Sequence, residues 1–126
     1  MREARLAVLN AALGLREKRL TAGKSGNVSA RHGTGFLVTA SGVAYEALEE
    51  EHIVFVDASG KCDGDYEPSS EWQLHREIYR ARPEVGAIVH AHPRHSTALA
   101  CARREIPAFH YMPEPAPQAP VEELAV

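Results

Sequence analysis

Two histidines separated by one residue are a first sign of chemistry in this sequence. His90 and His92 follow an apolar run that predicts a strand. Side chains at alternate positions of a strand point to the same face, so the two imidazoles would be aimed at one point. Two neutral imidazoles in that arrangement can serve as metal ligands. The alternative is a pair of hydrogen-bonded histidines at the edge of a sheet.

A glutamate directly after two serines is a second candidate. Glu71 follows Ser69 and Ser70 in the predicted first turn of a helix, where backbone N–H groups and the helix dipole favour a carboxylate or a bound phosphate. Helix capping alone would explain these residues, and spacing by itself favours that interpretation. A carboxylate beside a bound cation would also suit proton abstraction next to a carbonyl group.

Small polar pairs occur at two further places, Gly26-Asn27 and Ser41-Gly42. Such pairs usually form turns, but they can also offer backbone N–H groups and short side chains to an anion. Together with the histidines, they favour a phosphorylated small-molecule substrate. Lys24 and Arg31 could add positive charge to such a site.

Three other polar side chains receive less specific predictions. Tyr111 could donate a proton, although a packed aromatic ring is the alternative. We assign His75 and His52 to solvent-facing or capping positions.

The pattern of apolar residues predicts the elements that hold these side chains. Apolar residues recur every three or four positions from Leu6 to Leu20, which predicts an amphipathic helix, and a loop follows. Ser70 and Gln73 have capping-box spacing and predict a helix start, and Pro83 bounds that helix. Strands are predicted at 36–39, 53–56 and 85–91, a hairpin partner near 61–62, and a last helix from 95 or 96 to 104. This order predicts an α/β domain with a mixed sheet.

Composition narrows the class of protein. A chain of 126 residues with 44% hydrophobic and 25% charged residues fits one globular domain. Its net charge of −3 provides no basic surface for nucleic acid or an anionic membrane. We expect Cys62 and Cys101 to be free thiols in a reducing cytoplasm, and we expect neither a signal peptide nor a membrane span at the beginning of the chain. The proline-rich residues 113–126 are expected to form a disordered tail.

Several motifs together are more specific than any one of them. Taken in order, the sequence resembles the class II aldolase/adducin family from the first helix to Met112. The resemblance is carried by SGNVSAR at 25–31, LVTASGVAYEAL at 37–48, EHIVFVDASGK at 51–61, PSSEWQLHREIY at 68–79, AIVHAHPRHSTALA at 87–100 and IPAFHYM at 106–112.

The resemblance implies a three-layer fold, with a mixed sheet flanked by helices, in which residues 1–112 form a portion of the N-terminal domain. It also implies zinc-dependent cleavage of a ketose 1-phosphate to dihydroxyacetone phosphate and an aldehyde, in a homotetramer. Zinc would act as a Lewis acid, so no lysine Schiff base would be needed. By the same resemblance, Zn²⁺ would be bound by Glu71, His90 and His92, and Glu71 and Tyr111 would be catalytic, Tyr111 in a neighbouring subunit's site. The phosphate would be bound by Gly26, Asn27, Ser41, Gly42, Ser69 and Ser70.

The sequence departs from the family after Met112. Members of the family continue with further strands and a third histidine ligand, whereas no histidine follows His110 here. We therefore expect an incomplete sheet with an exposed edge, which favours association. Two alternatives to an aldolase stay open: a sugar-phosphate 4-epimerase or dehydratase of the same family, and a non-catalytic association module like the head domain of adducin.

Overall fold

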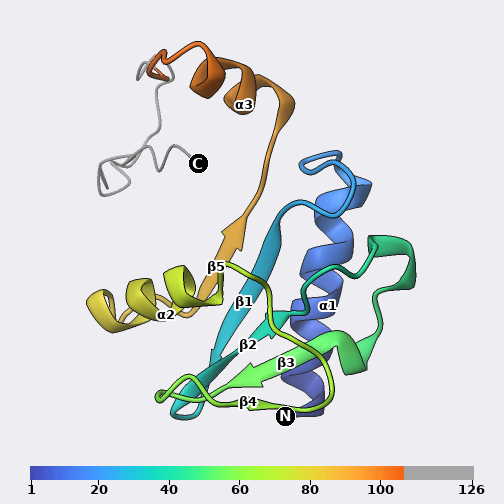
Figure 1. Ribbon diagram of the computed structural model, residues 1–126, viewed down its shortest axis with the longest axis vertical. Coiled ribbons are helices and arrows are strands. Elements are labelled where there is room, and N and C mark those ends of the chain that lie inside the picture. Colours follow the sequence, from blue (N-terminus) through green and yellow to red (C-terminus); the bar gives the residue numbers. More distant parts are fainter. Residues whose placement is uncertain (107–126) are drawn as a thin grey trace, which may run out of the picture. The chain divides into compact units, whose positions relative to one another are not determined.

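A five-stranded antiparallel sheet with a helix on each face forms the first part of the structure (Figure 1). The computed structural model describes residues 1–106. The chain divides into two compact units, Met1–His92 and a second that begins at Pro93. The sheet and the candidate site lie in the first unit. Tyr111 and the predicted tail at 113–126 lie outside the described residues.

The elements follow one another with short connections. Strands β1 to β5 are ordered β4-β3-β2-β1-β5 in the sheet, and every pair is antiparallel. The elements are α1 (Arg2–Glu17), β1 (Asn27–His32), β2 (Gly35–Thr39), the short 3-10 helices η1 (Tyr45–Ala47) and η2 (Glu50–His52), β3 (Ile53–Val56), β4 (Cys62–Asp63), α2 (Trp72–Ala81), β5 (Ala87–His90) and α3 (Arg94–Cys101). No helix within residues 1–106 is long and apolar enough to span a bilayer.

The α/β class and the flanking helices are confirmed, while the strand directions are more uniform than a mixed sheet would show. Within residues 1–106 no parallel strand pair occurs. The connections between β1 and β2 and between β3 and β4 are too short for the crossover that a parallel pair needs. β5 follows α2 and pairs antiparallel with β1 at the other edge.

Alternation along β2 divides the core into two layers. Leu37 packs on the α1 side, where the helix contributes Val8, Ala12 and Leu15. Phe36 and Val38 point to the opposite face and pack beneath α2 with Val56 and Tyr79. Because successive strand side chains face opposite ways, one apolar strand serves both helices.

The predicted helix at the start of the chain is confirmed, but its core-facing side differs from the leucine pattern. Leu6 and Leu13 are 38% and 37% exposed, whereas Val8, Ala12 and Leu15 are buried. The positions 8, 12 and 15 also have helical spacing, so the sequence contained two apolar stripes. Contact with the sheet decided which of them is buried.

β1 is the strand that the sequence pattern missed. Its residues were expected to be loop, because small polar side chains hide the alternation that indicates a strand. In the structure Val28 is buried beneath α1, and Ser29 is fully buried on the opposite face. The strand is therefore two-sided, with an apolar face and a buried polar face.

The predicted capping box at the start of α2 is wrong. The N-cap residue is Glu71, and no side chain caps the helix through a hydrogen bond. The carboxylate of Glu71 instead has a partner on β1, because the segment before α2 turns this side chain toward the sheet. Glu71 is thereby free to face the site described next.

Candidate active site

The site forms where β1 begins and β5 ends. These strands pair antiparallel with Asn27 directly opposite His90. Gly26, with φ of +82°, lies so close that a Cβ atom there would be 2.9 Å from the carbonyl oxygen of His90. Only glycine combines this left-handed conformation with such a close approach. The pairing register thus places the Asn27 and His90 side chains side by side on the α2 face.

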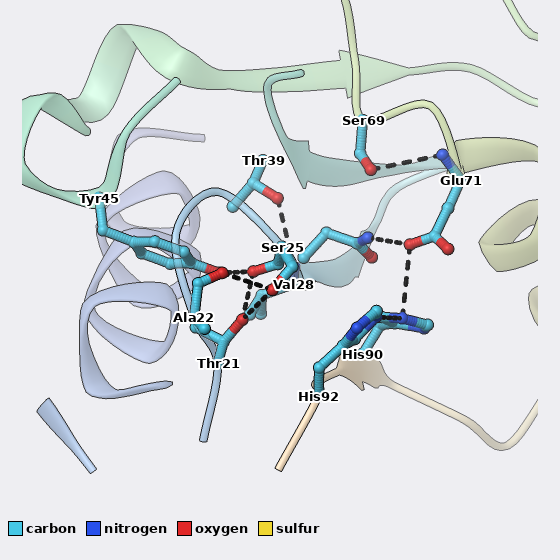
Figure 2. A network of polar contacts seen from close by, with 11 residues as sticks. Thr21, Ala22, Ser25, Val28, Thr39, Tyr45, Ser69, Glu71, His90 and His92 are labelled. Atoms are coloured by element: carbon cyan, nitrogen blue, oxygen red, sulfur yellow. Dashed lines mark hydrogen bonds and ion pairs between the residues drawn. The ribbon is translucent and has the colours of Figure 1, made fainter. Parts of the chain in front are cut away.

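Glu71 and the two predicted histidines converge beside Asn27. The Asn27 amide donates a hydrogen bond from Nδ2 to Oε2 of Glu71. The same carboxylate oxygen lies 3.7 Å from Nε2 of His90, and Nε2 of His90 lies 2.7 Å from Nε2 of His92 (Figure 2). Since two ring nitrogens at that distance share one proton, one imidazole donates and the other accepts. The structure therefore brings together one side chain from the N-cap of α2 and two from the end of β5 and the residues after it.

The donor atoms in this cluster suit a divalent metal in kind. Within residues 1–106 no three His, Cys, Asp or Glu side chains are already arranged to hold a metal ion. Two imidazole nitrogens and a carboxylate oxygen nevertheless form a zinc-type ligand set, and ligand nitrogens in a tetrahedral zinc site are about 3.3 Å apart. The observed separations of 2.7 and 3.7 Å lie on either side of that value. Each of these two separations is within about 0.6 Å of it.

A pocket of about 230 Å³ opens next to this cluster. All six residues predicted to bind phosphate line it. Glu71 and His92 of the cluster also line it. The lining residues are Lys24, Ser25, Gly26, Asn27, Ala40, Ser41, Gly42, Ser69, Ser70, Glu71 and His92. Segments far apart in the sequence thus meet in one small polar cavity.

Some backbone N–H groups of the pocket could donate to an anion, whereas others already have an acceptor within the protein. The Ser41 N–H already donates to the Glu67 carbonyl, and the Ser69 N–H to the Thr39 carbonyl. Those two backbone groups are therefore committed to the fold. In the described part of the chain, the N–H groups of Gly42 and Ser70 have no acceptor. They remain available to a ligand.

Of the two cations that the sequence suggested for this site, only Lys24 lines the pocket. Arg31 donates hydrogen bonds to the carbonyl oxygens of Tyr79, Arg82 and Val85. It therefore holds the far end of α2 rather than a ligand.

A small network fixes the loop that carries Lys24 and Ser25. Tyr45 Oη donates to the Ser25 carbonyl at 3.0 Å, and Thr21 Oγ1 donates to the same oxygen. Ser25 Oγ donates to the Ala22 carbonyl at 2.6 Å (Figure 2). Burial raises the pKa of Tyr45, so its hydroxyl stays protonated and keeps donating. The loop is thereby held in one shape at the pocket wall.

His75 is the residue near the site that sequence reasoning placed wrongly. It is 1% exposed rather than solvent-facing. Burial lowers its pKa from 6.5 to about 4, against the attraction of Glu71 and with a smaller contribution from His90. His75 is therefore neutral at pH 7. Its place one helical turn after Glu71 was the signal that could have identified it. His52, in contrast, caps η2, because its Nδ1 accepts from the N–H of Glu49.

Comparisons with known proteins found a matching family model and similar sequences. The family described as Class II Aldolase and Adducin N-terminal domain matches residues 6–123. L-fuculose phosphate aldolase of Escherichia coli K12 is 44% identical over 105 residues, which cover 83% of this chain and 49% of that protein. A 5-methylthioribulose-1-phosphate/5-deoxyribulose-1-phosphate aldolase of Rhodospirillum rubrum is 46% identical over 108 residues, which cover 86% of this chain and 49% of that protein. The chain spans about half the length of these relatives.

Solved structures show the same fold. An L-fuculose 1-phosphate aldolase superposes with a TM-score of 0.81 at 34% identity, covering 86% of this chain and 52% of the other. The L-fuculose-1-phosphate aldolase of Thermus thermophilus superposes with a TM-score of 0.69 at 35% identity, covering 80% of this chain and 52% of the other.

Proposed function

This chain belongs to the class II aldolase and adducin family, and we propose that it carries the metal- and phosphate-binding part of a site that cleaves ketose 1-phosphates. One observation carries the proposal: Glu71, His90 and His92 converge at the border of a polar pocket lined by every residue expected to bind phosphate. A carboxylate and two imidazoles beside an anion pocket suit bond cleavage next to the carbonyl of a phosphorylated sugar.

The substrate class follows from what the named relatives have in common. L-fuculose phosphate and the two ribulose 1-phosphates share one end, a phosphorylated C1 beside a C2 carbonyl. Cleavage between C3 and C4 converts this end to dihydroxyacetone phosphate and the other end to an aldehyde. The pocket is assigned to the shared end, and L-fuculose 1-phosphate and 5-deoxyribulose 1-phosphate are the substrates to test first.

The side chains divide the work by position. The pocket would hold the phosphate through Lys24, the serine hydroxyls and the free N–H groups of Gly42 and Ser70. Glu71, oriented by the Asn27 amide, would deliver a proton to C3 after the bond breaks and remove it in the reverse direction. In cleavage the C4 hydroxyl gives up its proton, and Tyr111 is the candidate group that exchanges it. His90 and His92 would hold Zn²⁺, with Glu71 as a further ligand in the resting site, and the metal would stabilise negative charge on the substrate oxygens.

Zinc content and product analysis test this proposal on the purified chain. We expect about one zinc per chain by elemental analysis, its loss in His92→Ala, and its retention in His32→Ala, a histidine of β1 outside the pocket. Release of dihydroxyacetone phosphate from one of the two ketose phosphates supports cleavage. A zinc-loaded chain that yields only an epimer or a dehydrated sugar contradicts the aldolase assignment. If the chain shows no bound zinc and no turnover, a non-catalytic association module is favoured.

Location and assembly are part of the same proposal. Cys62 and Cys101 are both free thiols, which is common in the reducing cytoplasm. A homotetramer would bring Tyr111 of one subunit to the site of another. Sedimentation velocity at several protein concentrations measures the assembly.

A further inference from the structure

Alternate side chains of β1 meet successive turns of α2. We call this arrangement the polar ladder. Two residues along a strand advance about 6.7 Å, and four residues along a helix advance about 6 Å. Because these distances are similar, every second strand residue can contact every fourth helix residue. The ladder consists of Asn27, Ser29 and Arg31 on β1, of Glu71 at the N-cap of α2, and of His75 and Tyr79 within α2.

The middle of the ladder is a buried three-residue chain. Ser29 Oγ lies 2.7 Å from His75 Nδ1 and 2.8 Å from Tyr79 Oη. The three residues are 0%, 1% and 6% exposed, respectively. Directional hydrogen bonds at such depth fix a helix more tightly than apolar contacts, because a lost bond leaves a buried polar group without a partner.

One proton arrangement satisfies this chain best. Tyr79 donates to Ser29, and Ser29 donates to Nδ1 of His75, which leaves the proton of His75 on Nε2. In the reverse direction His75 would donate to Ser29 and Ser29 to Tyr79. The tyrosine hydroxyl hydrogen would then have no acceptor, and the unprotonated Nε2 of His75 would have no donor. Burial raises the pKa of Tyr79 and lowers that of His75, in agreement with a protonated phenol and a neutral imidazole. The Nε2 atom of His75 is buried without a partner in the described residues.

The ladder ends link this chain to the site. At one end Arg31 donates to the Tyr79 carbonyl and its guanidinium lies 4.6 Å over the Tyr79 ring. At the other end Asn27 donates to Glu71, which precedes the first residue of α2. A rotation or slide of α2 would break the middle contacts and move the Glu71 carboxylate away from Asn27 and His90 together.

We propose that Ser29, His75 and Tyr79 are positioning residues that hold the Glu71 carboxylate against Asn27 and beside His90. They act through the placement of α2 and touch neither a metal nor a substrate. The catalytic meaning of this placement rests on the proposed function, whereas the placement itself can be measured without metal or substrate.

The side-chain amide of Asn27 is the reporter for the test. In the metal-free, ¹⁵N-labelled chain its NMR signals are identified by their loss in Asn27→Asp. Glu71→Gln defines their position when the carboxylate is absent. We expect Ser29→Ala and Tyr79→Phe to move the Asn27 signals more than halfway toward that position. In Ser29→Thr, which keeps the hydroxyl, the signals should stay near those of the unaltered chain. Val38→Ala, a buried β2 change on the same face without a polar group, serves as the control for lost stability.

The outcomes separate positioning from general stability. Asn27 signals that stay in place in both Ser29→Ala and Tyr79→Phe overturn the proposal, as does an equal shift in folded Val38→Ala. Circular dichroism confirms folding, and Tyr79→Phe, which removes one oxygen and adds no atom, keeps the test valid if Ser29→Ala unfolds. If the zinc-loaded chain turns over, the positioning variants should lower kcat roughly ten- to hundredfold with little change in KM. A shifted Asn27 signal in a chain without turnover would reject the proposed function and keep the positioning role.

Discussion

Glu71 has its place because Asn27, a residue 44 positions away, donates to its carboxylate. A glutamate at the start of a helix normally interacts with the helix dipole or caps the first turn. Here the side chain turns toward the sheet and lies 3.7 Å from an imidazole nitrogen. The same residue type at the same helical position thus interacts with the sheet rather than with the helix.

His75 makes the stability of the fold depend on pH. Because burial lowers its pKa from 6.5 to about 4, the unfolded chain binds a proton at a pH where the folded chain does not. Stability is therefore fully present above about pH 6.5 and falls as the pH drops toward 4, by at most about 1.4 kcal/mol per unit and about 3 kcal/mol in total. Urea unfolding between pH 4.5 and 7.5 measures this dependence.

Two variants isolate the contribution of His75. His75→Gln should be less stable at pH 7. Below pH 6.5 its free energy of unfolding should depend on pH less steeply, by close to the contribution of one proton. His32→Gln should keep the slope of the unaltered chain. A slope that persists in His75→Gln would show that His75 is not its source.

At the scale of elements, the site depends on the turn that leads into β1. Gly26 joins the loop that carries Lys24 to the strand that carries Asn27, and it lies against the His90 carbonyl. The register of β1 against β5 then aligns Asn27 with His90. A single glycine therefore connects the pocket wall to the histidine pair.

Gly26→Ala should destabilise the fold and weaken zinc binding together. Its Cβ would lie 2.9 Å from the His90 carbonyl oxygen at a φ of +82°, and a non-glycine residue in that region costs about 1–3 kcal/mol before any clash. Gly14→Ala is the matched control, because Gly14 lies in α1 with no atom within 4 Å of an added Cβ. It should raise stability by about 0.5–1 kcal/mol.

Thermal unfolding and zinc titration of both variants check this prediction. An alanine at position 26 that leaves the melting temperature and the zinc affinity unchanged would show that the turn tolerates a side chain. The close approach of this turn to β5 would then not matter for the site.

At the scale of the whole molecule, β5 is an edge strand with an apolar side chain in solvent. Among the strands of residues 1–106 it has a partner only on the β1 side, and Val89 is 56% exposed. Unpaired strand edges with apolar side chains favour pairing with another chain.

Val89→Lys should reduce self-association of this chain. A lysine on an edge strand adds charge and opposes pairing with a second edge. Sedimentation velocity should show a concentration-dependent rise in mass for the unaltered chain and a smaller rise for the variant. Leu13→Lys, which changes an exposed leucine of α1, is the comparison. If Leu13→Lys alone abolishes association, the contact lies on α1 and the β5 edge is not responsible.

The sequence by itself determined the residue types of the site and most of the elements. The paired histidines, Glu71 and the small polar turns could be identified because their chemistry is carried in short segments. Their resemblance to one family also predicted the layered fold, which the structure and its similarity to solved aldolases confirm. Amphipathic and apolar runs predicted α1, β2, β3 and α2, since the pattern of a helix or strand is local.

Only the tertiary structure decided which faces and partners these elements use. β1 became a strand through pairing with β2 and β5, although its polar residues resemble a loop. The sheet selected Val8 rather than Leu6 for the core face of α1, and it buried His75 against Ser29. Burial and hydrogen-bond partners depend on residues far apart in the chain, and no local pattern records them.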